Sequence, residues 1–138
     1  PTPAEIIVDS LILRYIDAFE FDYSVNNIIS FLHDNLKISV NFKKNLFENI
    51  NIQSNPQKFI IHSSFSCSDP QSEITLRLAT GQRNSKKALI METIVHWNNP
   101  TIALNVREII KWIDKSHTIV HDWFFKLIEG KLEEDFEK

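Results

Sequence analysis

The chain has 138 residues, a formal net charge of −3, 43% hydrophobic residues and 24% charged residues, a composition typical of one globular domain. With only two glycines and one cysteine, it lacks a glycine-rich phosphate loop, a GxSxG nucleophile elbow, an internal disulfide and a multi-cysteine zinc site. The negative net charge argues against electrostatic binding to nucleic acid. No apolar run approaches the roughly 18 residues of a membrane span, and no signal peptide is visible, so we expect a cytoplasmic protein.

The N-terminus indicates that the chain is part of something larger. It begins Pro1-Thr2-Pro3 without a methionine, and a strand-like pattern follows almost at once. We therefore expect residues 1–138 to form a single α+β domain, a fragment of a longer protein that lacks its N-terminal half.

The first predicted strand spans residues 6–22. Leu11, Leu13 and Tyr15 alternate with Ile12, Arg14 and Ile16, so both faces of the strand carry apolar side chains. We therefore expect cover on both sides of its middle. A short helix, capped by Asp22 or Ser24, is predicted to follow and to end near residue 36.

Three further strand patterns follow, at residues 59–67, 74–78 and 88–97. Successive strands joined by short polar turns are antiparallel by default. The sequence therefore predicts a curled antiparallel sheet of four to five strands. Because glycine is scarce, we expect asparagine to adopt the left-handed backbone conformations that some turns need.

The last element is predicted to be a long C-terminal helix over residues 105–129. Asn105 is a suitable cap and Glu108 stands three residues later, as in a capping box. The apolar stripe that follows is too broad for a two-stranded coiled coil and suits a helix packed on a sheet. Gly130 is expected to end or bend this helix before an acidic tail.

Asp114, His117 and His121 form the sharpest chemical constellation. They lie at positions i, i+3 and i+7 of the predicted helix and so project on one side of it. Two imidazoles and a carboxylate in this arrangement could bind a divalent metal ion. The alternative is that His117 is a half-buried histidine that packs against its neighbours.

Five other residues are candidates for contact with a ligand or partner: Arg14, Tyr15, Trp112, Trp123 and Phe125. Arg14 could bind a carboxylate or phosphate, or could instead form an ion pair within the chain. The aromatic residues of the last helix cannot all point in one direction. Some could therefore form an interface or line a cavity, unless core packing accounts for them all.

Three segments together resemble the C-terminal half of a sporadically distributed, uncharacterised bacterial protein family. They are Leu13-Arg14-Tyr15-Ile16-Asp17, Leu89-Ile90-Met91-Glu92-Thr93 and residues 110–117, which resemble the family's "LRYIN" strand, "LDID" strand and "LDxLH" helix. Asp17 and Glu92 depart from the family's usual asparagine and aspartate. The family has no established activity, so the resemblance assigns no catalytic residue. The order of elements also looks similar to SecB-like chaperone domains and helix-grip folds, which is a likeness of fold alone.

These observations favour a non-enzymatic module that binds a protein partner, its own missing N-terminal half or a second copy, without a cofactor. The first alternative is a small-ligand-binding domain with a cavity between the sheet and the long helix. The second is a metal-dependent enzyme built around Asp114, His117 and His121.

Overall fold

In a computed structural model, residues 9–98 and 105–137 can be described. The elements are β1 (Ser10–Glu20), α1 (Ile28–Leu36), a 3-10 helix η1 (Lys44–Phe47), β2 (Ile60–Ser68), β3 (Gln71–Arg83), β4 (Lys86–Asn98), α2 (Val106–Ile128) and α3 (Lys131–Glu137). None of the helices in these two ranges combines the length and hydropathy of a membrane span.

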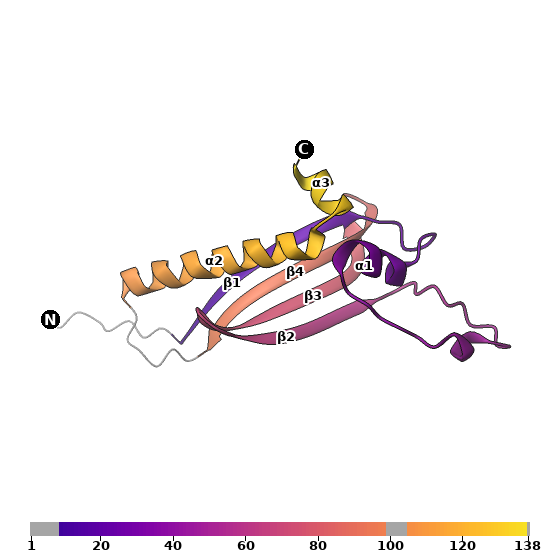
Figure 1. Ribbon diagram of the computed structural model, residues 1–138, viewed down its shortest axis with the longest axis horizontal. Helices are drawn as coiled ribbons and strands as arrows, with labels where there is room; N and C mark the ends of the chain where they lie inside the picture. Colours follow the sequence, from indigo (N-terminus) through magenta and orange to yellow (C-terminus); the bar gives the residue numbers. More distant parts are fainter. Residues whose placement is uncertain (1–8, 99–104, 138) are drawn as a thin grey trace.

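The four strands form one antiparallel sheet in the order β1-β4-β3-β2. β2, β3 and β4 follow one another as hairpins, and β4 also pairs with β1 on its other side. The first and second strands therefore lie at opposite edges of the sheet (Figure 1). The two-residue turn between β3 and β4 places Asn84 and Ser85 at φ angles of 52° and 66°, as tight hairpin turns require.

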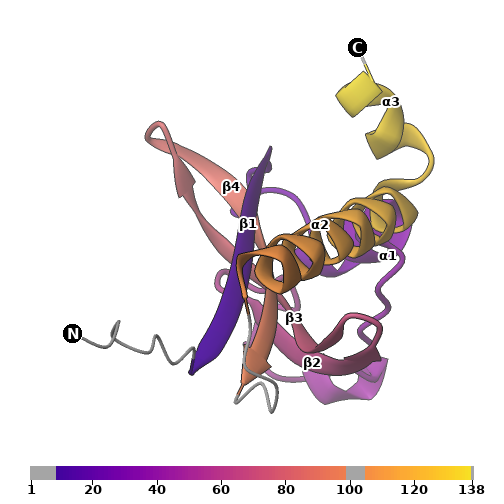
Figure 2. The same ribbon diagram turned by 90° about the vertical axis from the view of Figure 1, so that its left-hand side faces the viewer.

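Both main helices lie on the same side of the sheet (Figure 2). α2 contacts β1 and β4, and α1 packs against the C-terminal part of α2. The core is built in two clusters. One joins α1, the end of α2 and the sheet around Leu78 and Met91, and the other joins Trp112 and Val120 of α2 to Ile74 and Val95. The opposite face of the sheet is covered by no helix among the described residues.

Both helices begin at an asparagine cap. The side-chain oxygen of Asn105 accepts a hydrogen bond from the backbone N–H of Glu108 at 2.9 Å, and that of Asn27 accepts one from Ile29 at 2.8 Å. Each bond satisfies an N–H that has no partner within the helix. After α2, Gly130 adopts a φ of +115°, which L side chains rarely allow, and α3 sets off from it.

The predicted α+β architecture is confirmed: a four-stranded antiparallel sheet, a short helix after the first strand and a long C-terminal helix on the sheet. The sheet is not strongly curled, in contrast to the prediction, and its two edge strands stay apart.

The first helix begins at Ile28 with Asn27 as its cap, so the caps predicted at Asp22 and Ser24 were wrong. β3 runs from Gln71 to Arg83, beyond the predicted 74–78, because the strand pattern continues into the hairpin. The part of the first predicted strand before residue 9 lies outside the described residues.

The prediction that both faces of the first strand are covered was wrong. Leu11, Leu13 and Tyr15 face the helices and are partly buried in the second core cluster. On the other face, Ile12 and Ile16 remain 62% and 58% exposed. The face of β1 that carries Ile12 and Ile16 is therefore an exposed apolar surface, and it forms part of the candidate site.

Candidate functional site

No strand pairs with the outer backbone edge of β1 among the described residues, although the guanidinium of Arg83 donates to the carbonyl of Ala18 at 3.4 Å. The N–H of Phe21 donates to the carbonyl of Lys87 at 3.2 Å, and these residues continue the register in which Glu20 faces Ala88. Hydrogen bonding alternates along an antiparallel pair, so the odd-numbered residues of β1 bond to β4. The N–H and C=O groups of the even-numbered residues therefore point to the edge, where no strand pairs with β1 among the described residues. These edge-facing residues are Ser10, Ile12, Arg14, Ile16, Ala18 and Glu20.

The side chains of the same even-numbered residues lie on the face of the sheet that no helix covers. Beside the exposed Ile12 and Ile16, Arg14 forms an ion pair with Glu92 of β4, and Arg77 of β3 approaches the same carboxylate at 4.0 Å. Glu92 is only 9% exposed, and the two guanidinium groups compensate its charge. Arg14 therefore takes part in an ion pair within the chain, which is the alternative that the sequence left open for it.

On the other side of the same edge, α2 offers an apolar ridge. Trp112 and Trp123 turn toward β3 and β2: the indole N–H of Trp112 donates to the Gln71 carbonyl at 3.3 Å, and Trp123 meets the Phe65 ring at 5.5 Å. On the opposite flank is a ridge at helical spacing, of which His117, His121 and Phe124 lie against β1. We call it the α2 ridge; its residues are Val106, Ile110, Ile113, His117, His121 and Phe124. Val106, Ile110 and Ile113 are 72%, 54% and 40% exposed.

Where the α2 ridge meets β1, a hollow of about 140 Å³ is lined by Tyr15, Asp17, His117, Val120, His121 and Phe124. The ring of His117 lies 5.9 Å from that of Tyr15 and 6.4 Å from that of His121. Partial burial raises the pKa of Asp17 above its ordinary value, because burial disfavours the charged carboxylate. The volume is below the roughly 300 to 1,000 Å³ of typical ligand pockets, so the hollow does not favour the ligand-binding alternative.

The structure separates the five predicted contact residues into two groups. Trp112 is 4% exposed and Trp123 is partly buried, so both serve chiefly as core. Arg14 and Tyr15 lie on β1, and the partly buried Phe125 packs its ring 4.7 Å from that of His121. Three of the five therefore lie at or near the β1 edge, where the α2 ridge also lies.

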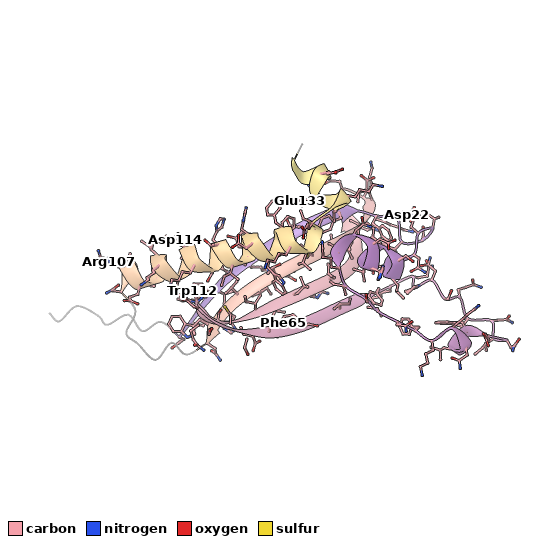
Figure 3. All side chains as sticks on the ribbon, in the orientation of Figure 1. Asp22, Phe65, Arg107, Trp112, Asp114 and Glu133 are labelled. Carbon is pink, nitrogen blue, oxygen red and sulfur yellow. The ribbon has the colours of Figure 1, made fainter. Side chains whose placement is uncertain are left out.

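The three predicted metal ligands do not form a metal site. Asp114 is exposed on α2 (Figure 3), whereas His117 and His121 stack on each other along the ridge. Within residues 9–98 and 105–137, no three His, Cys, Asp or Glu side chains are arranged to hold a metal ion. The contact with Tyr15 agrees with the alternative, in which His117 packs against its neighbours.

The opposite edge of the sheet has a different character. The N–H of Thr80 donates to the carbonyl of Phe59 at 3.0 Å, so the even-numbered residues of β2 face the open edge. Apart from Ile60 they are polar: His62, Ser64, Ser66 and Ser68. The sequence did not distinguish the two edges, because which strands lie at the edge follows from the pairing of β1 with β4 and not from any local pattern.

A second apolar surface lies on residues 37–59, the segment that contains η1 and extends away from the sheet (Figure 1). Phe42, Leu46, Ile50 and Ile52 are between 47% and 59% exposed. An open hollow of about 450 Å³ separates this segment from the start of α1, and Lys44 and Glu48 are the charged residues that line it. No strand or helix of the described residues covers these side chains.

No protein-family model, curated protein or solved structure matches the chain at a significant level.

Proposed function

We propose that the protein is a non-enzymatic interaction module that binds an extended segment of another protein chain along the β1 edge. The observation that carries this proposal is the coincidence of three features on one strand. No strand pairs with the edge-facing backbone groups among the described residues, Ile12 and Ile16 are exposed on one face, and the α2 ridge lies on the other. An added strand would gain main-chain hydrogen bonds from the edge and side-chain contacts from both faces.

The make-up of β1 supports this role. Edge strands that stay unpaired are usually short, or carry charged side chains, proline or a bulge that discourages pairing. β1 has eleven residues, contains no proline and pairs with β4 in an unbroken register; of its three charged residues, Arg14 and Glu20 form ion pairs with Glu92 and Lys86 within the chain. On the β2 edge, the edge-facing residues other than Ile60 are polar, and the exposed Phe65 on the helix side already contacts Trp123, so we assign the binding edge to β1. The likeness to an uncharacterised bacterial family remains a prediction that is compatible with this role.

The proposal can be tested with peptides and amide hydrogen exchange. Random peptides of about twelve residues, long enough to pair with all of β1, are selected by display against the immobilised protein. Exchange is then measured by NMR for the protein alone at high concentration and with a selected peptide. We expect an occupied edge to protect the N–H groups of the even-numbered β1 residues, which otherwise exchange faster than those of the odd-numbered residues.

Two matched variants sharpen the test. Ile16→Lys places a charge on the β1 edge, and Ile60→Lys places one on the β2 edge, where the isoleucine is similarly exposed at 50%. Peptide binding should be lost in the first variant and kept in the second. If the even-numbered amides of β1 exchange as freely as exposed loop amides in both samples, the proposed function is overturned.

A further inference from the structure

We infer that the partner of the β1 edge is a second copy of this chain, paired antiparallel around a two-fold axis at Ile16. The inference rests on the proposed function and deepens it by naming the partner and the register. Pairing of two β1 strands would join the two four-stranded sheets into one continuous sheet of eight strands, with both copies of α2 on the same side. A two-fold interface of this kind uses the same surface on both copies.

The register follows from which side chains would face each other. With the axis at Ile16, the two Ile16 side chains meet on the uncovered face, and Arg14 faces Ala18 of the second copy. Arg14 is then diagonal to Glu20 of the second copy, within reach of an attractive contact. On the helix side, Asp17 faces Tyr15, and Leu13 faces Phe19. No like charges stand directly opposite each other in this arrangement; the two Asp17 carboxylates are diagonal to each other on the helix side.

The neighbouring registers are less favourable. An axis at Asp17 sets two carboxylates directly opposite each other, and an axis at Arg14 does the same with two guanidinium groups. Like charges directly opposite in a sheet are destabilising. An axis at Tyr15 places Asp17 against Leu13. The partly buried Asp17, whose charge points toward the helices, thus acts as the residue that selects the register.

The helices would also meet in this dimer. α2 lies over β1 and β4, and neighbouring strands are about 4.8 Å apart. Two copies related across the β1 seam therefore have α2 axes about 10 Å apart, which is the separation of packed helices. Since the helices run antiparallel across the axis and His117 and His121 lie beside Tyr15 and Asp17, these histidines of the two copies would meet near the axis. The exposed Ile110 and Ile113 of one copy would then lie toward Phe124 and Phe125 of the second copy. The exposed part of the α2 ridge, Ile110 and Ile113, would be covered in the dimer.

Disulfide trapping tests both the partner and the register. In a Cys67→Ser background, which removes the only native cysteine, Tyr15→Cys, Ile16→Cys and Asp17→Cys are made as single variants. Facing residues that exchange hydrogen bonds have Cα atoms about 5.5 Å apart, within the range for a disulfide. We expect Ile16→Cys to form a covalent dimer at least tenfold faster than the other two under mild oxidation. A Ser64→Cys variant on the β2 edge serves as the control for random collision.

Light scattering of the unmodified protein completes the test, with a dimer as the expected species. Faster cross-linking of Tyr15→Cys or Asp17→Cys would overturn the register. A protein that stays monomeric at high concentration and cross-links no faster at Ile16 than at Ser64 would overturn self-pairing. Either result leaves the proposed function intact if a selected peptide still protects the β1 edge. The loss of peptide protection and of dimer together would instead refute that function.

Discussion

A charge at the centre of the proposed two-fold axis should separate the two copies without unfolding either. Ile16 is 58% exposed on the uncovered face of the sheet, so Ile16→Lys should change the free energy of unfolding of one copy by about 0.5 kcal/mol or less. In the dimer, however, the variant sets two ammonium groups near each other and removes the contact between two isoleucines.

The magnitude can be worked from that geometry. Two unit charges about 6 Å apart repel by roughly 0.7 kcal/mol in bulk water and by roughly 3 kcal/mol at the effective dielectric constant of a partly buried site. The lost isoleucine pair contributes a further 0.2 to 1 kcal/mol or so. We therefore expect the dissociation constant of the dimer to rise between about fivefold and several hundredfold, since about 1.4 kcal/mol is a factor of ten.

Sedimentation velocity over a range of concentrations measures the dissociation constant. Mixing variants of opposite charge then tests whether the effect arises from contact between the two residues at position 16. Ile16→Glu alone should dissociate in the same way, whereas an equimolar mixture of Ile16→Lys and Ile16→Glu should recover the dimer, because opposite charges then face each other. Ile60→Lys, on the β2 edge, should behave as the parent protein. If the mixture does not recover or if Ile60→Lys is equally disruptive, the reasoning about the Ile16 axis is refuted.

Three predictions concern the fold itself. The Ser116 hydroxyl is fully buried and has no hydrogen-bond partner among the described residues, so Ser116→Ala should stabilise the protein by about 1 kcal/mol in chemical denaturation; a destabilised variant would contradict this. Asn105→Ala removes the cap of α2 and should lower the free energy of unfolding by about 1 kcal/mol, whereas the exposed Asn51→Ala should leave it nearly unchanged. Because burial raises the pKa of Asp17, its charged form disfavours folding above that pKa and its protonated form does not. Asp17→Asn should therefore be more stable than the parent at pH 7, and the difference should shrink as the pH falls from the raised pKa toward about 4 and be absent below it, as measured by thermal unfolding; a difference that stays constant from pH 7 to below about 4 would contradict the assignment.

Much of the architecture was predictable, because it depends on local patterns. The alternation in β2, β3 and β4 and the broad apolar stripe of α2 gave the right types of element in the right order. The cap at Asn105 was also predicted correctly, since the asparagine and Glu108 are only three residues apart. Left-handed asparagines occur at Asn49 and Asn84, as the scarcity of glycine indicated.

The site was less predictable, because it depends on contacts between distant segments. Spacing on one helix brought His117 and His121 together, but it could not show that β1 supplies Tyr15 and Asp17 beside them. These four residues line one hollow because the last strand, β4, pairs with the first strand, β1, and so brings β1 next to α2. In the same way, nothing local distinguishes the tryptophans that fill the core from Phe125, which lies beside the ridge.

The most informative error concerns β1. Its alternating apolar residues predicted cover on both faces, a pattern that usually belongs to a strand in the middle of a packed structure. The fold instead places this strand at an edge and leaves Ile12 and Ile16 exposed. A strand with the composition of an interior strand at an exposed position is prone to pair with whatever extended chain it meets. A second copy in a register selected by Asp17 would restore cover to the β1 edge and the α2 ridge, bring the two Ile16 side chains together, and leave no further β1 edge open to indiscriminate pairing.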